Sequence, residues 1–417
     1  MGNTLKFIDM VAREALAIAH EKVSFIGTVD RQYDDSFAKT GGKGGSTLRV
    51  RNPNRYTRRK GSRVMDVQDQ AESTQDLTLA TQDGVDMRFN SAEMTLDTDS
   101  SKDVAAFSKR YIEPAVSSLL SGIEADFLAY ATKRVYNCIG GPVAGGEVTV
   151  TPTVLQIGLG RARLNQMLAP KDGRCVQLDS VNMATLVNSA AAYFNPGADI
   201  GKQYREGLVS RTQMADFYEN ERLHTLTNIA DVTANTDADA LVTDGGITMA
   251  LASDLASPTV GAIFTVAGVY ACHPETKTNL GHLQQYTILT TGSTTTSITV
   301  SPATILTGAG QNVCSSTGSA LAITDYNEKA ALFVGEASNS YIQPIMYHPD
   351  AFQFVTADLP LFDSAERCTR RTQEGLSIRV WQAPDIRNDE LLMRLDILYG
   401  FGALRPEWAT RFVFKND

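Results

Sequence analysis

The segment TILTTGSTTTSITV, residues 287–300, carries no charge and consists of threonine, serine, glycine and aliphatic residues. It lies in a region, 223–366, that contains no arginine, and residues 225–325 contain 21 threonines and a single lysine, Lys277. Short alternating runs such as AIFTVAGVY, QYTILTT and TSITVSP are separated by proline, glycine and asparagine. This pattern is typical of antiparallel strands joined by turns, so the region is expected to form a small β-barrel or sandwich.

The sequence on either side of this region mixes helical and strand patterns. Residues 153–169 and 180–196 are rich in leucine and alanine and predict two helices. Near the end of the chain, LLMRLDILYG alternates apolar residues with Arg394 and Asp396. This predicts a strand whose apolar side chains share one face while both charged side chains point the other way. We infer an all-β domain inserted into an α/β body, because insertions succeed at exposed loops whose ends are close together.

Charge is distributed in two opposite blocks near the N-terminus. Residues 36–63 contain nine basic residues and no acid, and residues 64–103 contain ten acids and two bases. STLRVRN and DGVDMRFN, one from each block, alternate apolar and charged residues and are expected to pair as a long β-hairpin over about 46–97. Since an isolated hairpin is marginally stable in water, this one is expected to lie on another subunit. A nucleic-acid-binding arm is the less favoured alternative, because aromatics are few and acids lie close by.

Two helical patterns flank this hairpin. Residues 5–18 place apolar side chains at helical spacing and predict an amphipathic helix, which packs either on its own domain or on a partner. Ser100 and Asp103 have the spacing of a capping box and begin an apolar stripe. This predicts a long helix to about Asn137, kinked at Pro114, which lacks an amide donor.

The chain shows no set of residues that predicts catalysis or cofactor binding. Its five histidines and five cysteines form no H-E-x-x-H or CxxC pattern, and GGKGGST lacks the phosphate-loop spacing because Lys43 precedes Gly44. Cys272, His273 and His282 share one predicted strand and turn, where turn residues without a ligand role are the favoured interpretation. No apolar run is long enough for a membrane span, and the N-terminus lacks the pattern of a signal peptide. We therefore expect no enzyme, no cofactor and no metal, in a protein that stays in a reducing cytoplasm.

Three segments resemble the P22-type major capsid (coat) proteins of tailed bacteriophages. QYREGLVSRTQMADFYENERLHT, residues 203–225, is similar to the sequence that precedes the inserted domain of that family. GAIFTVAGVYACHPETKTNLGHLQQYTI, residues 261–288, resembles the core of the inserted domain, and LYGFGALRPEW, residues 398–408, resembles the closing strand. The positions that carry the first and last matches are Tyr204, Arg205, Gly207, Ala215, Phe217, Tyr218, Glu219, His224, Thr225, Tyr399, Gly400, Arg405, Pro406 and Glu407.

The resemblance implies an HK97-like capsid fold of α+β class, with an N-terminal arm, an extended β-hairpin E-loop, a long spine helix and an inserted small all-β barrel. The implied divisions are the arm (1–35), the E-loop hairpin (36–100), the spine helix and peripheral domain (101–140), a peripheral/axial domain (141–225), the inserted barrel (226–333) and the closing strands of the axial/peripheral domain (334–417).

The resemblance also implies a function. Subunits of that family form pentamers and hexamers that close into an icosahedral shell enclosing phage double-stranded DNA without sequence-specific binding, in the host cytoplasm. A scaffolding protein and a portal protein are the implied partners. An encapsulin-type nanocompartment shell shares the fold and stays open as an alternative, and a β-rich adhesin or glycan-binding protein is a further one drawn from the threonine-rich region alone.

The charge blocks and the acidic loop of the insert supply the expected contacts between subunits. In relatives an acidic loop of the insert reaches a neighbouring capsomer, and the acids at 237–244 lack the glycine and glutamate of a calcium loop. The expected contact residues are Arg49, Arg51, Arg55, Arg58, Arg59, Arg63, Asp66, Asp69, Glu72, Asp76, Asp237, Asp239 and Asp244.

Overall fold

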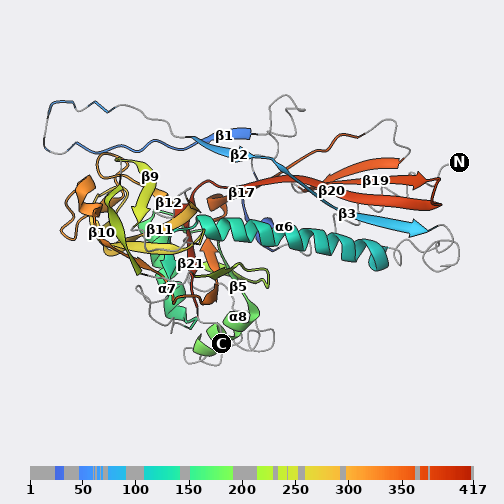
Figure 1. Ribbon diagram of the computed structural model, residues 1–417, viewed down its shortest axis with the longest axis horizontal. Helices are drawn as coiled ribbons and strands as arrows, with labels where there is room; N and C mark the ends of the chain where they lie inside the picture. The colour runs from blue at the N-terminus through green and yellow to red at the C-terminus, as the bar shows by residue number, and fades with distance from the viewer. Residues whose placement is uncertain are drawn as a thin grey trace. The chain divides into compact units, whose positions relative to one another are not determined.

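The computed structural model describes residues 24–31, 47–59, 61, 63–65, 67–68, 74–90, 108–140, 151–190, 214–228, 233–241, 243–251, 259–291, 297–361, 367–373 and 376–414. Figure 1 shows the helices and strands coloured from the N-terminus to the C-terminus. The chain divides into two compact units. The first unit comprises Met1–Val50, Thr74–Phe127 and Phe352–Gly402, and the second comprises Arg51–Ser73, Leu128–Ala351 and Ala403–Asp417.

The fold is of α+β class, as predicted. The helices are α2 (Phe25–Thr28), the π-helical segment η1 (Ser108–Ile112), α6 (Glu113–Arg134), α7 (Val154–Gln166) and α8 (Ser180–Ala190), with short 3₁₀ segments η3 (Ile323–Tyr326), η4 (Pro349–Ala351) and η5 (Pro406–Trp408). Helices α7 and α8 lie where the leucine and alanine patterns predicted them. None of the helices in the described part of the chain has the length and apolar character needed to cross a membrane.

Helix α6 corresponds to the predicted long helix and ends three residues earlier than expected. Pro114 is its second residue and directly follows η1, so the missing amide donor coincides with the change from π-helical to α-helical hydrogen bonding. Lys133 and Arg134 lie in the last turn, where positive charge is favourable. The predicted helix start at Ser100 and the predicted helix at 5–18 lie outside the described residues.

The first unit is built on a mainly antiparallel sheet and an aromatic core. The sheet has the order β17-β20-β19-β18, and β3 also pairs with β20. Phe127 of α6 packs against Phe25, with ring centroids 4.8 Å apart, and against Phe401, at 5.1 Å. The strands are β3 (Thr81–Asn90), β17 (Phe352–Ala357), β18 (Arg367–Gln373), β19 (Leu376–Asp385) and β20 (Glu390–Ala403).

The pairing expected for the two charged strands is wrong. DGVDMRFN belongs to β3 and pairs antiparallel with β20, so that Phe89 lies opposite Leu391 and Met87 opposite Met393. The hairpin forms instead between β1 (Thr47–Arg51) and β2 (Thr74–Thr78). Alternation of apolar and charged residues identifies a strand with one apolar face, but it does not specify which strand pairs with it. Here β20 is the strand that has a matching apolar face.

The burial of Asp396 was not indicated by the alternating pattern of β20. Met393, Leu395, Ile397 and Tyr399 of β20 are buried as predicted, but Asp396 is also fully buried. Its Oδ2 accepts a hydrogen bond from Arg379 Nη2 at 2.6 Å, and its Oδ1 accepts one from Arg394 Nε at 3.0 Å. A Cβ at Gly84 of β3 would lie 2.7 Å from Asp396 Oδ1, so glycine lets β3 approach a buried ion pair that alternation alone could not reveal.

The second unit contains a five-stranded sheet covered by α7 and α8. Its order is β4-β21-β16-β5-β6. Ile157 and Leu164 of α7 and Met183 and Leu186 of α8 share one apolar core with Phe412 of the sheet. The strands are β4 (Cys138–Ile139), β5 (Arg174–Leu178), β6 (Ala215–Glu219), β16 (Ile345–Tyr347) and β21 (Ala409–Phe412).

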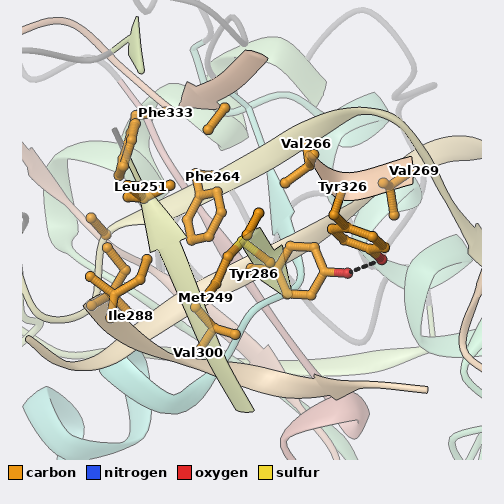
Figure 2. Close-up of a cluster of buried hydrophobic side chains, with 14 of the residues drawn as sticks. Met249, Leu251, Phe264, Val266, Val269, Tyr286, Ile288, Val300, Tyr326 and Phe333 are labelled. Atoms are coloured by element: carbon orange, nitrogen blue, oxygen red, sulfur yellow. Dashed lines mark hydrogen bonds between the residues drawn. The ribbon is translucent and has the colours of Figure 1, made fainter. Parts of the chain in front are cut away.

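The threonine-rich region of the second unit forms a closed antiparallel barrel among its described strands. The order β11-β12-β9-β8-β14-β10 returns to β11, and β13 (Val313–Cys314) adds to β10. Figure 2 shows the core, where Phe264 and Tyr286 stack and the hydroxyls of Tyr286 and Tyr326 are hydrogen-bonded at 3.0 Å. The other strands are β8 (Thr233–Leu241), β9 (Gly246–Leu251), β10 (Ile263–Cys272), β11 (Asn279–Thr291), β12 (Ser297–Thr304) and β14 (Ala330–Phe333).

The chain enters and leaves the barrel through a pair of strands that we call the neck. Strand β7 (Thr225–Thr227) leads in, β15 (Ser340–Ile342) leads out, and the two pair antiparallel. Asn228 Nδ2 donates to Val334 O at 2.9 Å and Glu336 O at 3.0 Å. A Cβ at Gly335, which has φ +94°, would lie 2.6 Å from Asn228 Nδ2. Because the neck holds the two ends of the barrel segment side by side, the barrel is a compact insertion that leaves and rejoins the rest of the chain at one place.

Candidate assembly surfaces

The β1–β2 hairpin brings two of the predicted contact residues together within one chain. Arg49 Nε lies 3.4 Å from Asp76 Oδ1, and both side chains are mostly exposed. Thr47 Oγ1 and Thr78 Oγ1 are 3.5 Å apart at the other end of the strand pair. An exposed pair of this kind contributes ~0–1 kcal/mol, so it aligns the hairpin and leaves both charges close to solvent.

The segment that continues from β1 is held on the second unit by an ion pair. Arg55 Nη2 lies 3.8 Å from Glu407 Oε1, next to the end of the closing strand. Burial raises the pKa of the Glu407 carboxyl, and the positive charges of Arg55 and Arg405 oppose that rise. Arg51 and Arg55 are exposed, so this segment keeps positive charge at the surface.

Beyond this segment lies a loop, and we call its described residues 58–59, 61, 63–65 and 67 the tip. The loop is closed by Gln68, whose Oε1 accepts from Thr57 N at 2.8 Å and whose Nε2 donates to Thr57 O at 2.6 Å. Within the loop, the Arg59 guanidinium donates to Val64 O. The side chains of Arg58, Arg59 and Arg63 are exposed, whereas Asp66, Asp69 and Glu72 lie outside the described residues.

The three acids predicted in the barrel have unequal positions. Asp237 and Asp239 lie on β8, of which the structure describes the backbone at these positions. Asp244 is exposed in the turn between β8 and β9, where its carboxylate accepts from Leu306 N at 2.7 Å and from Thr307 Oγ1 at 3.3 Å. Asp244 therefore braces a neighbouring loop of its own barrel as well as presenting charge.

The single lysine of residues 225–325 is hydrogen-bonded within the barrel region. Lys277 Nζ donates to Ala309 O at 2.7 Å and to Gln311 O at 3.1 Å. Burial lowers the pKa of this lysine. Residues 225–325 contain seven acids and this one base, so the barrel carries a net negative charge that its own lysine only slightly offsets.

A polar junction that the sequence analysis missed connects the barrel to the sheet of the second unit. Arg411 of β21 is fully buried; its Nη1 donates to Gln343 Oε1 at 3.1 Å and its Nη2 to Thr287 Oγ1 at 3.0 Å. Thr287 Oγ1 donates in turn to Lys133 O at 3.0 Å, and Gln285 Nε2 donates to Cys138 O at 3.0 Å. Burial lowers the pKa of Arg411 to about 10.

Exposed apolar side chains form a second feature that the charge pattern concealed. Val64, Met65 and Val67 of the tip are 76%, 78% and 78% exposed. Their signal was the run RVMDV, which places three apolar residues in a segment otherwise noted only for its charge. An exposed apolar cluster next to several arginines is the kind of surface that proteins use for contacts.

The described residues combine an exposed charged hairpin with a barrel that is inserted through the neck. Residues 223–412, from just before the neck to the end of β21, match the model of the family described as P22 coat protein, gene protein 5. The match covers 190 of the 417 residues and supports the resemblance of this chain to the P22-type major capsid proteins of tailed phages. The similarity is to a structural, self-associating protein of the virion shell and not to an enzyme family.

Solved structures of phage capsids are similar over most of their length. A chain of Mycobacterium phage Che8 is 11% identical with a TM-score of 0.48, covering 93% of this chain and 90% of that chain. The capsid of cyanophage P-SCSP1u gives 12% identity and 0.42, covering 90% and 85%, and the capsid of Ralstonia phage GP4 gives 7% and 0.45, covering 90% and 85%. A comparison with curated protein sequences finds no match.

Proposed function

We propose that this chain is a major capsid protein and forms pentamers and hexamers that close into an icosahedral shell around double-stranded DNA. A scaffolding protein guides assembly in the host cytoplasm and a portal protein occupies one vertex. The observation that carries the proposal is the match of residues 223–412 to the coat-protein family model, on a chain that also presents an exposed charged hairpin.

In this proposal the hairpin supplies ionic contacts to neighbouring copies. The basic side lies over 49–63 and the acidic side over 66–76, and the barrel acids Asp237, Asp239 and Asp244 offer a second set of negative charges. Each exposed pair contributes only ~0–1 kcal/mol, so a wrongly placed subunit dissociates while a closed shell, with its many contacts, persists.

The overall charge fits the proposed content of the shell. The chain has a net charge of −9, and a protein with a surplus of acids does not neutralise DNA phosphates over a broad surface. The packaged duplex is therefore enclosed without being tightly bound.

The experiment that tests the proposal is electron microscopy of particles from the overexpressed chain and from a tip variant. In the variant, residues 58–67 are replaced by two glycines, which leaves the Thr57–Gln68 closure and both hairpin strands intact. We expect uniform polyhedral particles from the original chain, and from the variant folded subunits that form no closed shells. A control with ten glycine and serine residues at 58–67 separates loop length from loop chemistry. Normal particles from both variants would refute the role of the hairpin.

A further inference from the structure

The tip combines an apolar centre with a cationic surround. Val64, Met65 and Val67 are three-quarters exposed, and Arg58 and Arg63 beside them are also exposed. Single exposed apolar side chains are ordinary, but three within four residues of one loop are a typical protein-contact patch. Apolar anchors with a charged rim are the arrangement found at the centres of protein interfaces.

The tip is also held in shape before it meets a partner. The two hydrogen bonds between Thr57 and Gln68 close its base, and the Arg59 guanidinium donates to Val64 O inside it. Hydrogen bonds that are formed before binding reduce the conformational entropy lost on binding, so a small apolar patch beside them can contribute to affinity.

A surface with the complementary pattern lies on the barrel. Ile247 at the start of β9 is 51% exposed, and Asp244 is exposed three residues before it. Strand β8, which carries Asp237 and Asp239, pairs with β9. Lys277 already donates to two carbonyl groups, so the lysine of residues 225–325 does little to offset these acids. Ile247 is an exposed apolar side chain three residues after an exposed acid, on a strand that pairs with the acid-bearing strand β8. This pattern is complementary in charge and polarity to an apolar tip that also carries arginines.

We infer that the tip of one copy docks on the β8–β9 edge of the barrel of a second copy, with Val64, Met65 and Val67 against Ile247 and the tip arginines against the barrel acids. The inference rests on the proposed shell function and names the partner surface of the hairpin. Both faces belong to this chain, and their opposite charges favour a second copy over an acidic or basic protein of another kind.

The test is cross-linking between two differently tagged chains that are assembled together. One chain carries Val67→Cys and the other Ile247→Cys, both with Cys368→Ser, because Cys368 is half-buried whereas the other native cysteines are buried. Isolated particles are treated with a short bis-maleimide, which adds both thiols. The matched control replaces Val67→Cys by Ile386→Cys, at a residue that is 96% exposed in the turn between β19 and β20.

Docking predicts a covalent band with the summed mass of the two tagged chains, at least roughly tenfold stronger than in the control, because docking raises the local thiol concentration. Particles that give no band, or equal bands for both pairs, would overturn the contact. A link that forms only within a doubly substituted chain would overturn it too, since the tip would then lie on its own barrel. If microscopy of the same sample shows no particles, the proposed function fails together with the contact.

A second variant keeps the inference testable without cross-linking. Val64→Asp, Met65→Asp and Val67→Asp together place negative charge on side chains that are mostly in water, so the urea midpoint of the subunit stays unchanged. We expect a severalfold lower yield of closed particles, and recovery of yield when Ile247→Arg is added to place a positive charge opposite the three aspartates. An unchanged yield from the triple variant would contradict the inference.

Discussion

The tip and the barrel core are both parts of the second unit, and they use apolar residues in opposite ways. The barrel buries Phe264, Tyr286 and Ile288 completely, whereas the tip leaves Val64 and Met65 in water. The barrel core is complete within one copy of the chain. In the proposed contact, the tip becomes buried against a second copy of the chain. The comparison separates the residues that fold this protein from those that assemble it, and substitutions in the two regions should therefore change different measurements.

The largest effect is expected in the barrel core. Phe264→Ala removes a ring that stacks on Tyr286 and packs on Phe333, at centroid distances of 5.7 and 5.4 Å. We expect the free energy of unfolding to fall by ~3–5 kcal/mol in urea titrations followed by circular dichroism. The matched control, Ile247→Ala on the same barrel, should change it by less than ~0.5 kcal/mol. Equal effects of the two substitutions would contradict the division between core and surface.

The junction at Arg411 should give the next largest effect. Arg411→Met keeps much of the volume but leaves the Thr287 hydroxyl and the Gln343 amide without a buried donor, at a cost of ~1–3 kcal/mol. Thr287→Val tests the same contact from the barrel side. If the two residues act together, the double variant should be less destabilised than the sum of the single variants, by ~0.5–3 kcal/mol. Additive losses would show that the junction does not couple the barrel to the sheet.

His224 gives this unit a predicted dependence on pH. Its Nε2 is buried and has no hydrogen-bond partner among the described residues, and burial, together with Lys133 and Arg411, lowers its pKa to about 4. The folded state therefore favours the neutral ring, so the linked stability is complete above about pH 6.5 and is lost as the pH falls towards 4. Urea midpoints measured from pH 7 to 4 should decline less steeply for His224→Gln. Parallel curves would rule out this group as the source.

The smallest effect on folding, with a large one on assembly, is expected in the hairpin. Arg49→Ala breaks an exposed pair with Asp76 and should change the free energy of unfolding by less than ~1 kcal/mol. Particle yield should fall and become less sensitive to salt, because one ionic contact is lost in every copy. The charge swap Arg49→Asp with Asp76→Arg restores the pair within the hairpin but reverses both charges towards a neighbour. Full recovery of yield by the swap would argue that the pair acts only inside its own hairpin.

The local sequence predicted whether several segments form helices or strands, but it did not predict which strands pair with each other. The strands of the threonine-rich region and helices α7 and α8 came from periodicity, because burial on one face produces that periodicity directly. The pairing of β3 with β20 joins residues about 300 positions apart, and nothing local to DGVDMRFN specifies so distant a partner.

Charge in the sequence indicated several exposed residues of the hairpin but concealed the exposed apolar residues among them. The basic run 49–63 and the acids of the barrel were visible as composition, and the structure places Arg49 beside Asp76 and exposes Arg58 and Arg63. The apolar residues of the tip were hidden among these charges. Buried polar groups such as Arg411 and Asp396 were missed because an arginine or aspartate in an alternating strand usually faces water. Burial of Arg411 and of Asp396 is offset by their hydrogen bonds to Thr287 and to Arg379, which lie elsewhere in the sequence.

The neck has a practical consequence for engineering. Because Thr225–Thr227 and Ser340–Ile342 pair with each other, whatever lies between them begins and ends at almost the same point. A foreign domain whose own termini are adjacent fits the same opening without stretching the chain, and a short turn closes it. The neck is therefore a suitable insertion point for fusing a cargo protein, an epitope or an enzyme, with one copy per subunit.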